Sequence, residues 1–165
     1  MSEVRERAQV AARQVHVPAA PPPPAPSYVG LVTRVVAFVV DAAILNAVAA
    51  IVAASAALVI SVFPISHTVH TVLVAIGGVV YFAWLIGYFA TFWATTGQTP
   101  GNRVMRIRVT RPDGTRVRPV RALLRVAGLA LAALPLFAGF VPILFNDRRR
   151  GLADWMADTV VVTAT

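Results

Sequence analysis

The sequence lacks cysteine and lysine altogether and is poor in acidic residues. Its 165 residues include fifteen basic ones, all arginine, and seven acidic ones. Without cysteine there is no disulfide framework, no thiolate metal site and no cysteine nucleophile. Charged residues amount to only 13% of the chain, and Asp41 is the only acid between Glu6 and Asp113. A carboxylate so far from any other acid in the sequence is therefore a candidate for a special role.

Apolar residues, by contrast, are abundant. They make up 58% of the chain, and the mean hydropathy is +0.72. Soluble domains contain about 45–50% apolar residues, glycine included, and about 25% charged residues. The composition therefore argues against an ordinary cytosolic enzyme and indicates a membrane protein. The length allows one membrane domain and a tail.

Residues 1–27 are predicted to form a disordered, proline-rich cytoplasmic tail. Charged residues continue to Arg13, so the first positive charges are not followed by the apolar core of about 7–15 residues that a secretory signal requires. Prolines then crowd residues 18–26, and such a segment is an extended, semi-rigid linker without a packed core. Residues 28–163 are expected to form the membrane domain.

Two long apolar stretches predict transmembrane helices over about 31–63 and 69–95. About 20 apolar residues in a helix cross a bilayer, and each stretch exceeds this length. The segment 64–70 between them contains a proline and no arginine, and is predicted to be a short loop. Its two histidines, His67 and His70, are expected to be solvated, because no acid or cysteine accompanies them as a further metal ligand.

A third apolar stretch, residues 126–145 of a helix predicted over about 120–146, leaves two alternatives open. It has about the length of a bilayer, but Pro135 and Pro142 interrupt it. A single, kinked crossing would place the arginines that follow it outside the cell. A re-entrant pair of half-helices, bent near residues 134–139, would keep both ends inside, and such segments occur where protein shields them. The charge distribution favours the re-entrant alternative.

The segment between the second and third stretches is predicted to form a small cap outside the bilayer. A threonine-proline pair at 99–100 is typical of a helix N-cap followed by proline at the first helical position. Apolar and polar residues then alternate with the period of a half-buried strand, and the Pro-Asp-Gly sequence at 112–114 is a turn signal. Residues 105–118 are therefore predicted to form a β-hairpin, to which the β-prone run 159–163 could add a third strand. The predicted fold is an all-α multi-pass membrane protein with a cytoplasmic cap of a hairpin or three strands.

The arginines predict the orientation, because cytoplasmic flanks are enriched in arginine and lysine. The tail contains three arginines before its prolines, segment 64–70 contains none, and segment 95–125 contains eight. The N-terminus and the cap are therefore expected in the cytoplasm, in a plasma or inner membrane. Anionic headgroups would attract the cap by about 1 kcal/mol per nearby arginine. Nucleic acid is not expected as a partner, because no aromatic residues interleave with these arginines.

Asp41 lies well inside the first predicted helix, where a carboxylate costs about 2.5–3.5 kcal/mol on insertion scales. Arg34 is seven residues earlier, on the same helix face, but about 10 Å away along the axis. Each charge is therefore expected to have another partner. Two explanations of Asp41 remain open: a carboxylate that binds a proton or a cation, and a structural anchor that locks helix packing. Arg125, at the start of the third stretch, is expected to extend its side chain to the cytoplasmic interface.

No group of residues points to catalysis. No Ser-His-Asp set lies on one side of the predicted membrane, no His-Glu-x-x-His sequence occurs, and no carboxylates are paired at an obvious spacing. The chain is therefore not expected to be an enzyme, and neither a cofactor nor a metal site is predicted.

Four blocks of the sequence stand out in order: residues 28–41, residues 97–109, residues 121–125 and residues 148–162. Together they resemble the blocks of the RDD family of membrane proteins, which is named for one arginine and two aspartates. The resemblance covers about residues 28–163 and implies that Arg34 is the family arginine, Asp41 the first aspartate and Asp154 the second. The supporting motif residues are Gly30, Ala37, Gly97, Thr99, Pro100, Gly101, Arg103, Arg121, Arg125, Gly151 and Thr159.

The chain departs from the family pattern at three positions. Asn102 stands where a basic residue is usual, Ala153 replaces a common histidine, and Asp158 stands where glycine is usual.

The resemblance implies transport of an ion or small solute, by cation/proton exchange, with Asp41 as the titrating or cation-contacting group. Arg34 and Asp154 would form a charge pair at the cytoplasmic mouth. Three apolar stretches are few for a transport path, so a homo-oligomer is expected. The alternative is a non-transporting membrane adaptor or scaffold, whose arginine-rich cap binds a partner protein or anionic lipid.

Overall fold

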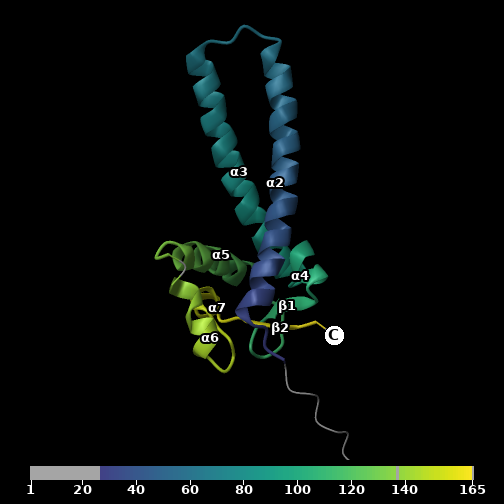
Figure 1. Ribbon diagram of the computed structural model, residues 1–165, viewed down its shortest axis with the longest axis vertical. Coiled ribbons are helices and arrows are strands. Elements are labelled where there is room, and N and C mark those ends of the chain that lie inside the picture. The colour runs from purple at the N-terminus through teal and green to yellow at the C-terminus, as the bar shows by residue number, and fades with distance from the viewer. Residues whose placement is uncertain (1–26, 137, 165) are drawn as a thin grey trace, which may run out of the picture.

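Two long helices and a group of short elements make up the computed structural model, which describes residues 27–136 and 138–164 (Figure 1). The tail predicted for residues 1–27 lies, apart from Ser27, outside the described residues. Helix α2 covers Leu31–Ser61 and helix α3 covers His67–Thr95, close to the predicted bounds of 31–63 and 69–95. His67 and His70 are exposed, in agreement with the expectation that they are solvated, but they belong to the first turn of α3 and not to the loop.

Both long helices are apolar on nearly all sides, yet the protein covers little of their surface. The buried residues of α2 are Arg34, Ala37, Asp41 and Leu45, which form one narrow stripe, and α3 buries only Trp93. A helix that is apolar all round and not covered by protein is typical of a membrane span. By length and composition, α2 and α3 are the two helices in the described part of the chain that could cross a membrane.

Few contacts join α2 to α3, and the two helices diverge toward the loop that connects them (Figure 1). Ser66 caps the start of α3, because its side chain accepts a hydrogen bond from the Val69 amide. After α3, the chain turns at Gly97, whose φ is 71°. Thr99 then caps helix α4 (Pro100–Val104), which begins with proline. The predicted helical turn after the threonine-proline pair is confirmed.

The third apolar stretch does not form one long helix, so the predicted helix over 120–146 is wrong. Helix α5 covers Pro119–Ala133 and is followed by a turn, the short 3-10 helix η1 (Ala138–Phe140) and helix α6 (Pro142–Phe145). Proline cannot donate a backbone hydrogen bond and clashes with the preceding helical turn, which explains the interruption near Pro135. Within the described residues, no third helix is long enough to cross a membrane, so the single crossing is not shown. Helix α5 ends at Ala133, next to the bend that the re-entrant alternative placed near residues 134–139. This helix lies across the ends of α2 and α3 (Figure 1).

The chain folds back onto α5 after this turn. A Cβ atom at Gly139 would lie 2.6 Å from the Ala132 Cα atom, and a Cβ atom at Gly128 would lie 2.7 Å from the Ala153 Cα atom. Ala153 belongs to helix α7 (Leu152–Ala157), which packs along α5. Glycine at these two positions therefore allows the backbones of η1 and α7 to approach α5 closely.

Strand β1 (Ile107–Thr110) pairs with strand β2 (Val160–Thr163) in an antiparallel two-stranded sheet. The prediction of a terminal strand is confirmed, but the β-hairpin predicted over 105–118 is wrong. Residues 115–118 do not form a strand. The second edge of β1 is occupied instead by the turn before α4, where the Val109 amide donates to the Gly97 carbonyl over 2.8 Å.

The predicted three-strand cap is likewise not found. Beside the two strands, the described residues contain only an isolated bridge between Tyr28 and Val162. The hydrophobic core lies where the sheet meets the ends of the long helices, and its buried members are Val29, Ala37, Trp93, Ile107, Val109, Val117, Ala122 and Val161.

Gly101 sets the distance between α4 and α2. A Cβ atom at this position would lie 2.1 Å from the Ala37 carbonyl oxygen and 2.8 Å from the Asp41 Cγ atom. Because one contact is with backbone, a larger side chain forces the two helices apart.

We expect Gly101→Ala to lower the free energy of unfolding by about 1–3 kcal/mol, the usual cost of overpacking. Gly77→Ala in α3 is the matched control, because a Cβ atom there meets nothing within 4 Å. The control should be neutral or stabilising by up to about 1 kcal/mol, because alanine favours helix more than glycine does. Denaturant unfolding in detergent measures both variants, and equal stabilities would contradict this account of the α2–α4 contact.

Candidate functional site

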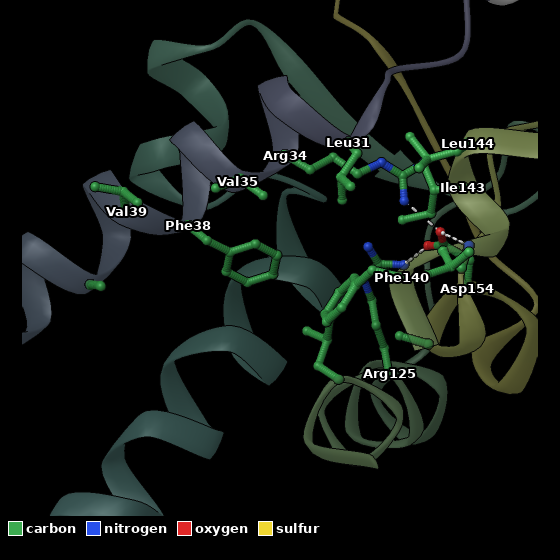
Figure 2. Close-up of a pocket in the computed structure, with 15 residues that line it drawn as sticks. Leu31, Arg34, Val35, Phe38, Val39, Arg125, Phe140, Ile143, Leu144 and Asp154 are labelled. Atoms are coloured by element: carbon green, nitrogen blue, oxygen red, sulfur yellow. Dashed lines mark hydrogen bonds and ion pairs between the residues drawn. The ribbon is translucent and has the colours of Figure 1, made fainter. Parts of the chain in front are cut away.

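Two buried polar clusters lie on the same stripe of α2. The first, here called the arginine cluster, consists of Arg34, Arg125 and Asp154, which come from α2, α5 and α7. All three are buried, with exposed fractions of 7%, 3% and 1%. Arg34 and Asp154 are 120 positions apart in the sequence, and the fold brings them into contact (Figure 2).

The Asp154 carboxylate is the centre of the arginine cluster. It accepts one hydrogen bond from Arg34 Nη1 over 2.5 Å, one from Arg125 Nη1 and one from the Gly151 amide over 3.0 Å. The expected contact between Arg34 and Asp154 is therefore present. The bond to Gly151 also ties the carboxylate to the start of its own helix, where a negative charge is favourable.

The two guanidinium groups have further partners, but not equally. Arg34 uses its remaining nitrogens fully: Nε donates to the Val29 carbonyl over 3.2 Å and Nη2 to the Arg149 carbonyl over 2.7 Å. Arg125 donates from Nη1 to the Thr159 hydroxyl over 2.7 Å, and its guanidinium lies 4.9 Å from the centre of the Trp93 ring. Its Nε atom is buried without a hydrogen-bond partner among the described residues.

The arginines decide the charge state of Asp154. Burial by itself would raise the pKa of Asp154, but the guanidinium groups of Arg125 and Arg34 hold that pKa below its usual value. The carboxylate is thus ionised at neutral pH. With two positive charges and one negative charge, the arginine cluster carries a net charge of +1.

The expectation that Arg125 extends to the cytoplasmic interface is wrong. A stripe of small buried residues on α5 surrounds it: Ala122, Gly128 and Ala132. These small side chains leave room for one long one, which turns inward to reach the Asp154 charge. A single arginine within a stripe of small residues was the sequence signal for this position.

The second cluster surrounds Asp41 and contains no arginine. The buried Asp41 carboxylate, 1% exposed, accepts hydrogen bonds from the Thr99 hydroxyl (2.5 Å), the Gly101 amide (2.8 Å) and the Tyr88 hydroxyl (2.9 Å). As expected from the spacing along α2, Arg34 is not its partner. The sequence reasoning did not single out Tyr88, which is one of many aromatic residues in α3.

The remaining motif residues either support these clusters or lie apart from them. Gly30 precedes α2 and lies against the Arg149 side chain. Arg121 forms an ion pair with Asp158 over 2.8 Å at the edge of the arginine cluster. Asp158 has a left-handed backbone with φ of 49°, which explains why the resemblance leads us to expect glycine there. Arg103 is exposed on α4, away from both clusters.

A cavity of about 640 Å³ adjoins the arginine cluster. Figure 2 shows it between α2, with Val35 and Phe38, and the elements that carry Arg125, Phe140 and Leu144. No group of three or more histidine, aspartate or glutamate side chains in residues 27–136 and 138–164 could hold a metal ion.

We expect Asp154→Asn to lower the free energy of unfolding by about 3–5 kcal/mol, because it leaves two buried guanidinium groups without a counter-charge. The pH dependence provides an independent readout. The pKa of Asp154 is lower in the folded state than the usual aspartate value of 3.8, so ionised Asp154 stabilises the folded protein. This stabilisation is complete above pH 3.8 and is lost as the pH falls through the lowered pKa. Unfolding in detergent at several pH values should show this loss in the wild type but not in Asp154→Asn.

The exposed Asp147 supplies the control, Asp147→Asn, which should behave as the wild type does. An equal loss of unfolding free energy in Asp154→Asn and Asp147→Asn would contradict the assignment.

Comparison with known proteins identifies the family of the chain that carries these clusters. The model of the RDD family matches residues 28–158, the span that contains α2 through α7 and both clusters. No curated protein and no solved structure matches the chain. The match covers most of the sequence, agrees with the resemblance of its four blocks, and includes two helices of membrane-spanning length. The chain therefore belongs to the RDD family and is a protein of membrane type.

Proposed function

We propose that the protein exchanges a monovalent cation for a proton across the membrane, with Asp41 as the group that binds each in turn. The observation that carries this proposal is the environment of Asp41. A carboxylate in a helix of membrane-spanning length is buried, and its hydrogen-bond donors among the described residues are all uncharged: Thr99, Gly101 and Tyr88. The arginine cluster, in contrast, already neutralises its own carboxylate and offers no comparable exchange.

The chemistry of this site suits two ligands of the same charge. A buried carboxylate without a counter-charge is costly, and either a bound proton or a bound monovalent cation removes its net charge. The Thr99 and Tyr88 hydroxyl groups donate to the carboxylate, and after rotation their oxygens can accept from a protonated carboxyl or contact a cation. Oxygen atoms are the ligands that hard cations prefer. Exchange of one ligand for the other is therefore electroneutral at the site.

The transport proposal includes a homo-oligomer in the plasma membrane. The exposed apolar surfaces of α2 and α3 and the few contacts between them support association of several copies around a path. The arginine-rich cap and N-terminus would face the cytoplasm, because arginine is enriched on that side. Arg34 and Asp154 would then close the cytoplasmic end of the path. Arg34 lies seven residues before Asp41 on α2.

A second candidate function is an adaptor without transport, in which Asp41 only anchors α4 to α2. One observation favours it: the cap exposes several arginines for which the described residues provide no ion pair. A partner protein or anionic headgroups could bind this surface, which contains Arg103, Arg106, Arg108, Arg116 and Arg118.

Asp41→Asn separates the two functions. Under the transport proposal, cation-driven proton flux in liposomes with an internal pH-sensitive dye should fall to that of protein-free liposomes, because a neutral amide cannot alternate between a proton and a cation. Thr99→Val removes a hydrogen bond to a charged group, which contributes about 1.5–3 kcal/mol, so exchange should slow by about tenfold or more. Thr99→Ser keeps the hydroxyl and serves as the matched control, with flux close to that of the wild type.

The transport proposal fails if correctly folded Asp41→Asn retains its flux. It also fails if the purified wild type shows no flux for Na⁺, K⁺ or Li⁺. In that case, loss of stability in Asp41→Asn would support the adaptor, because the carboxylate would then act only as an anchor.

The orientation can be tested directly because the chain contains no cysteine. A single cysteine at Ile65, between α2 and α3, should react with a membrane-impermeant maleimide added to intact cells. A single cysteine at Arg116 in the cap should react only after the membrane is permeabilised. The reverse pattern would contradict the proposed orientation.

A further inference from the structure

The cavity beside the arginine cluster combines an apolar wall with one charged end. Of the residues that line it, only Arg34, Arg125 and Asp154 are charged, and nearly all the others are aliphatic or aromatic. The charged end lies near the start of α2. The apolar wall continues along the same helix through Val35, Val39 and Ala42, toward the middle of the membrane span.

The three charges at this end of the cavity do not cancel. One carboxylate faces two guanidinium groups, so a charge of +1 remains among side chains that are at least nine-tenths buried. Arg34 has a hydrogen-bond partner for each of its nitrogens, but the buried Nε atom of Arg125 has none among the described residues. Figure 2 shows the Arg125 side chain reaching from α5 toward Arg34 and Asp154, with Phe38 across the open space.

A buried charge without compensation is costly, and so is a buried donor without a partner. A ligand with one negative charge at the charged end of the cavity would compensate the charge that remains there. The apolar part of the cavity, however, would not be filled by a small hydrated anion. The complementary ligand is therefore an amphiphile with a singly charged anionic head and a hydrocarbon chain.

The walls of the cavity also indicate where this ligand comes from. Val39 and Leu144, on opposite walls, are 61% and 63% exposed in the isolated chain. Val39 belongs to the first third of a helix of membrane-spanning length, and we infer that the cavity opens sideways toward the bilayer at this level. A lipid of the surrounding leaflet can enter there without leaving the membrane.

We propose that this cavity binds one anionic phospholipid of the bilayer, with its phosphodiester group at Arg125 and an acyl chain along Val35, Val39 and Ala42. This site is separate from Asp41, so it does not depend on the transport proposal. The bound lipid neutralises the remaining charge of the arginine cluster and fills the space between α2, α5 and α6.

The test compares lipids that differ only in the charge of the headgroup. Purified full-length protein in detergent is titrated with phosphatidylglycerol, with phosphatidylcholine of the same acyl chains, or with inorganic phosphate, and the thermal unfolding midpoint is recorded. A ligand that binds only the folded state raises this midpoint. Phosphatidylglycerol should raise it in a saturable manner, and native mass spectrometry should detect one retained lipid. Phosphatidylcholine and inorganic phosphate should have much weaker effects.

Two pairs of variants locate the lipid. Val39→Trp fills the cavity without touching the arginine cluster, and should weaken the apparent Kd for phosphatidylglycerol by about tenfold or more, equivalent to about 1.4 kcal/mol. Val36→Trp, at an exposed position outside the cavity, is its matched control and should bind as the wild type does. Leu129→Trp and its control Leu131→Trp repeat the comparison from the wall formed by α5, should the α2 variants fail to fold.

Three results would overturn the proposal. Equal effects of the two phospholipids would exclude recognition of the charge, and an equal effect of inorganic phosphate would exclude the acyl chain. Equal binding by the filled variants and their controls would place the lipid on the exposed arginines of the cap instead. Asp41→Asn should retain the binding of phosphatidylglycerol, so a failure of the transport proposal does not affect this result.

Discussion

The interaction on which the rest of the structure depends is the sharing of one buried carboxylate, Asp154, between Arg34 and Arg125. It joins the start of a long helix, a transverse helix and a short C-terminal helix. A buried charge pair is costly to break, because each partner is unfavourable when the other is absent. The contact therefore gives a direction to the packing of α2, α5 and α7, which the non-directional apolar core alone does not supply.

Close backbone packing makes such a contact possible in a small protein. Gly101, Gly128 and Gly139 stand where a side chain would collide with the neighbouring element. These three contacts bring α4 onto α2, and bring α7 and η1 onto α5. The approach of α4 to α2 also brings the Gly101 amide to the Asp41 carboxylate. At this motif position the glycine therefore both allows the close approach and supplies the donor that the carboxylate uses.

The sequence was sufficient to predict features that depend on neighbouring residues. The bounds of α2 and α3 follow from apolar length, and the start of α4 follows from the Thr99-Pro100 pair. Strand β1 and the terminal strand that joins it were also predictable, but the second strand of the hairpin was wrong. The turn at Gly97 occupies the other edge of β1 through a hydrogen bond that no local pattern reveals. The contact of Tyr88 with Asp41 likewise depends on tertiary packing, and the inward direction of Arg125 is indicated in the sequence only by the small residues around it on α5. The pairing of Arg34 with a distant aspartate followed from its separation of about 10 Å from Asp41 along the helix axis and from the family resemblance.

The two charged residues on α2 also fix the position of this helix along its axis. Arg34 binds an element on one side of the cap, and Asp41 binds α4 on the other, seven residues further on. A shift of α2 by a single residue would turn it by about 100° and move it by about 1.5 Å, so that both contacts would be lost together. An insertion or deletion between these two positions would therefore break both contacts, whereas the part of α2 beyond Leu45 has no buried residue that fixes its length.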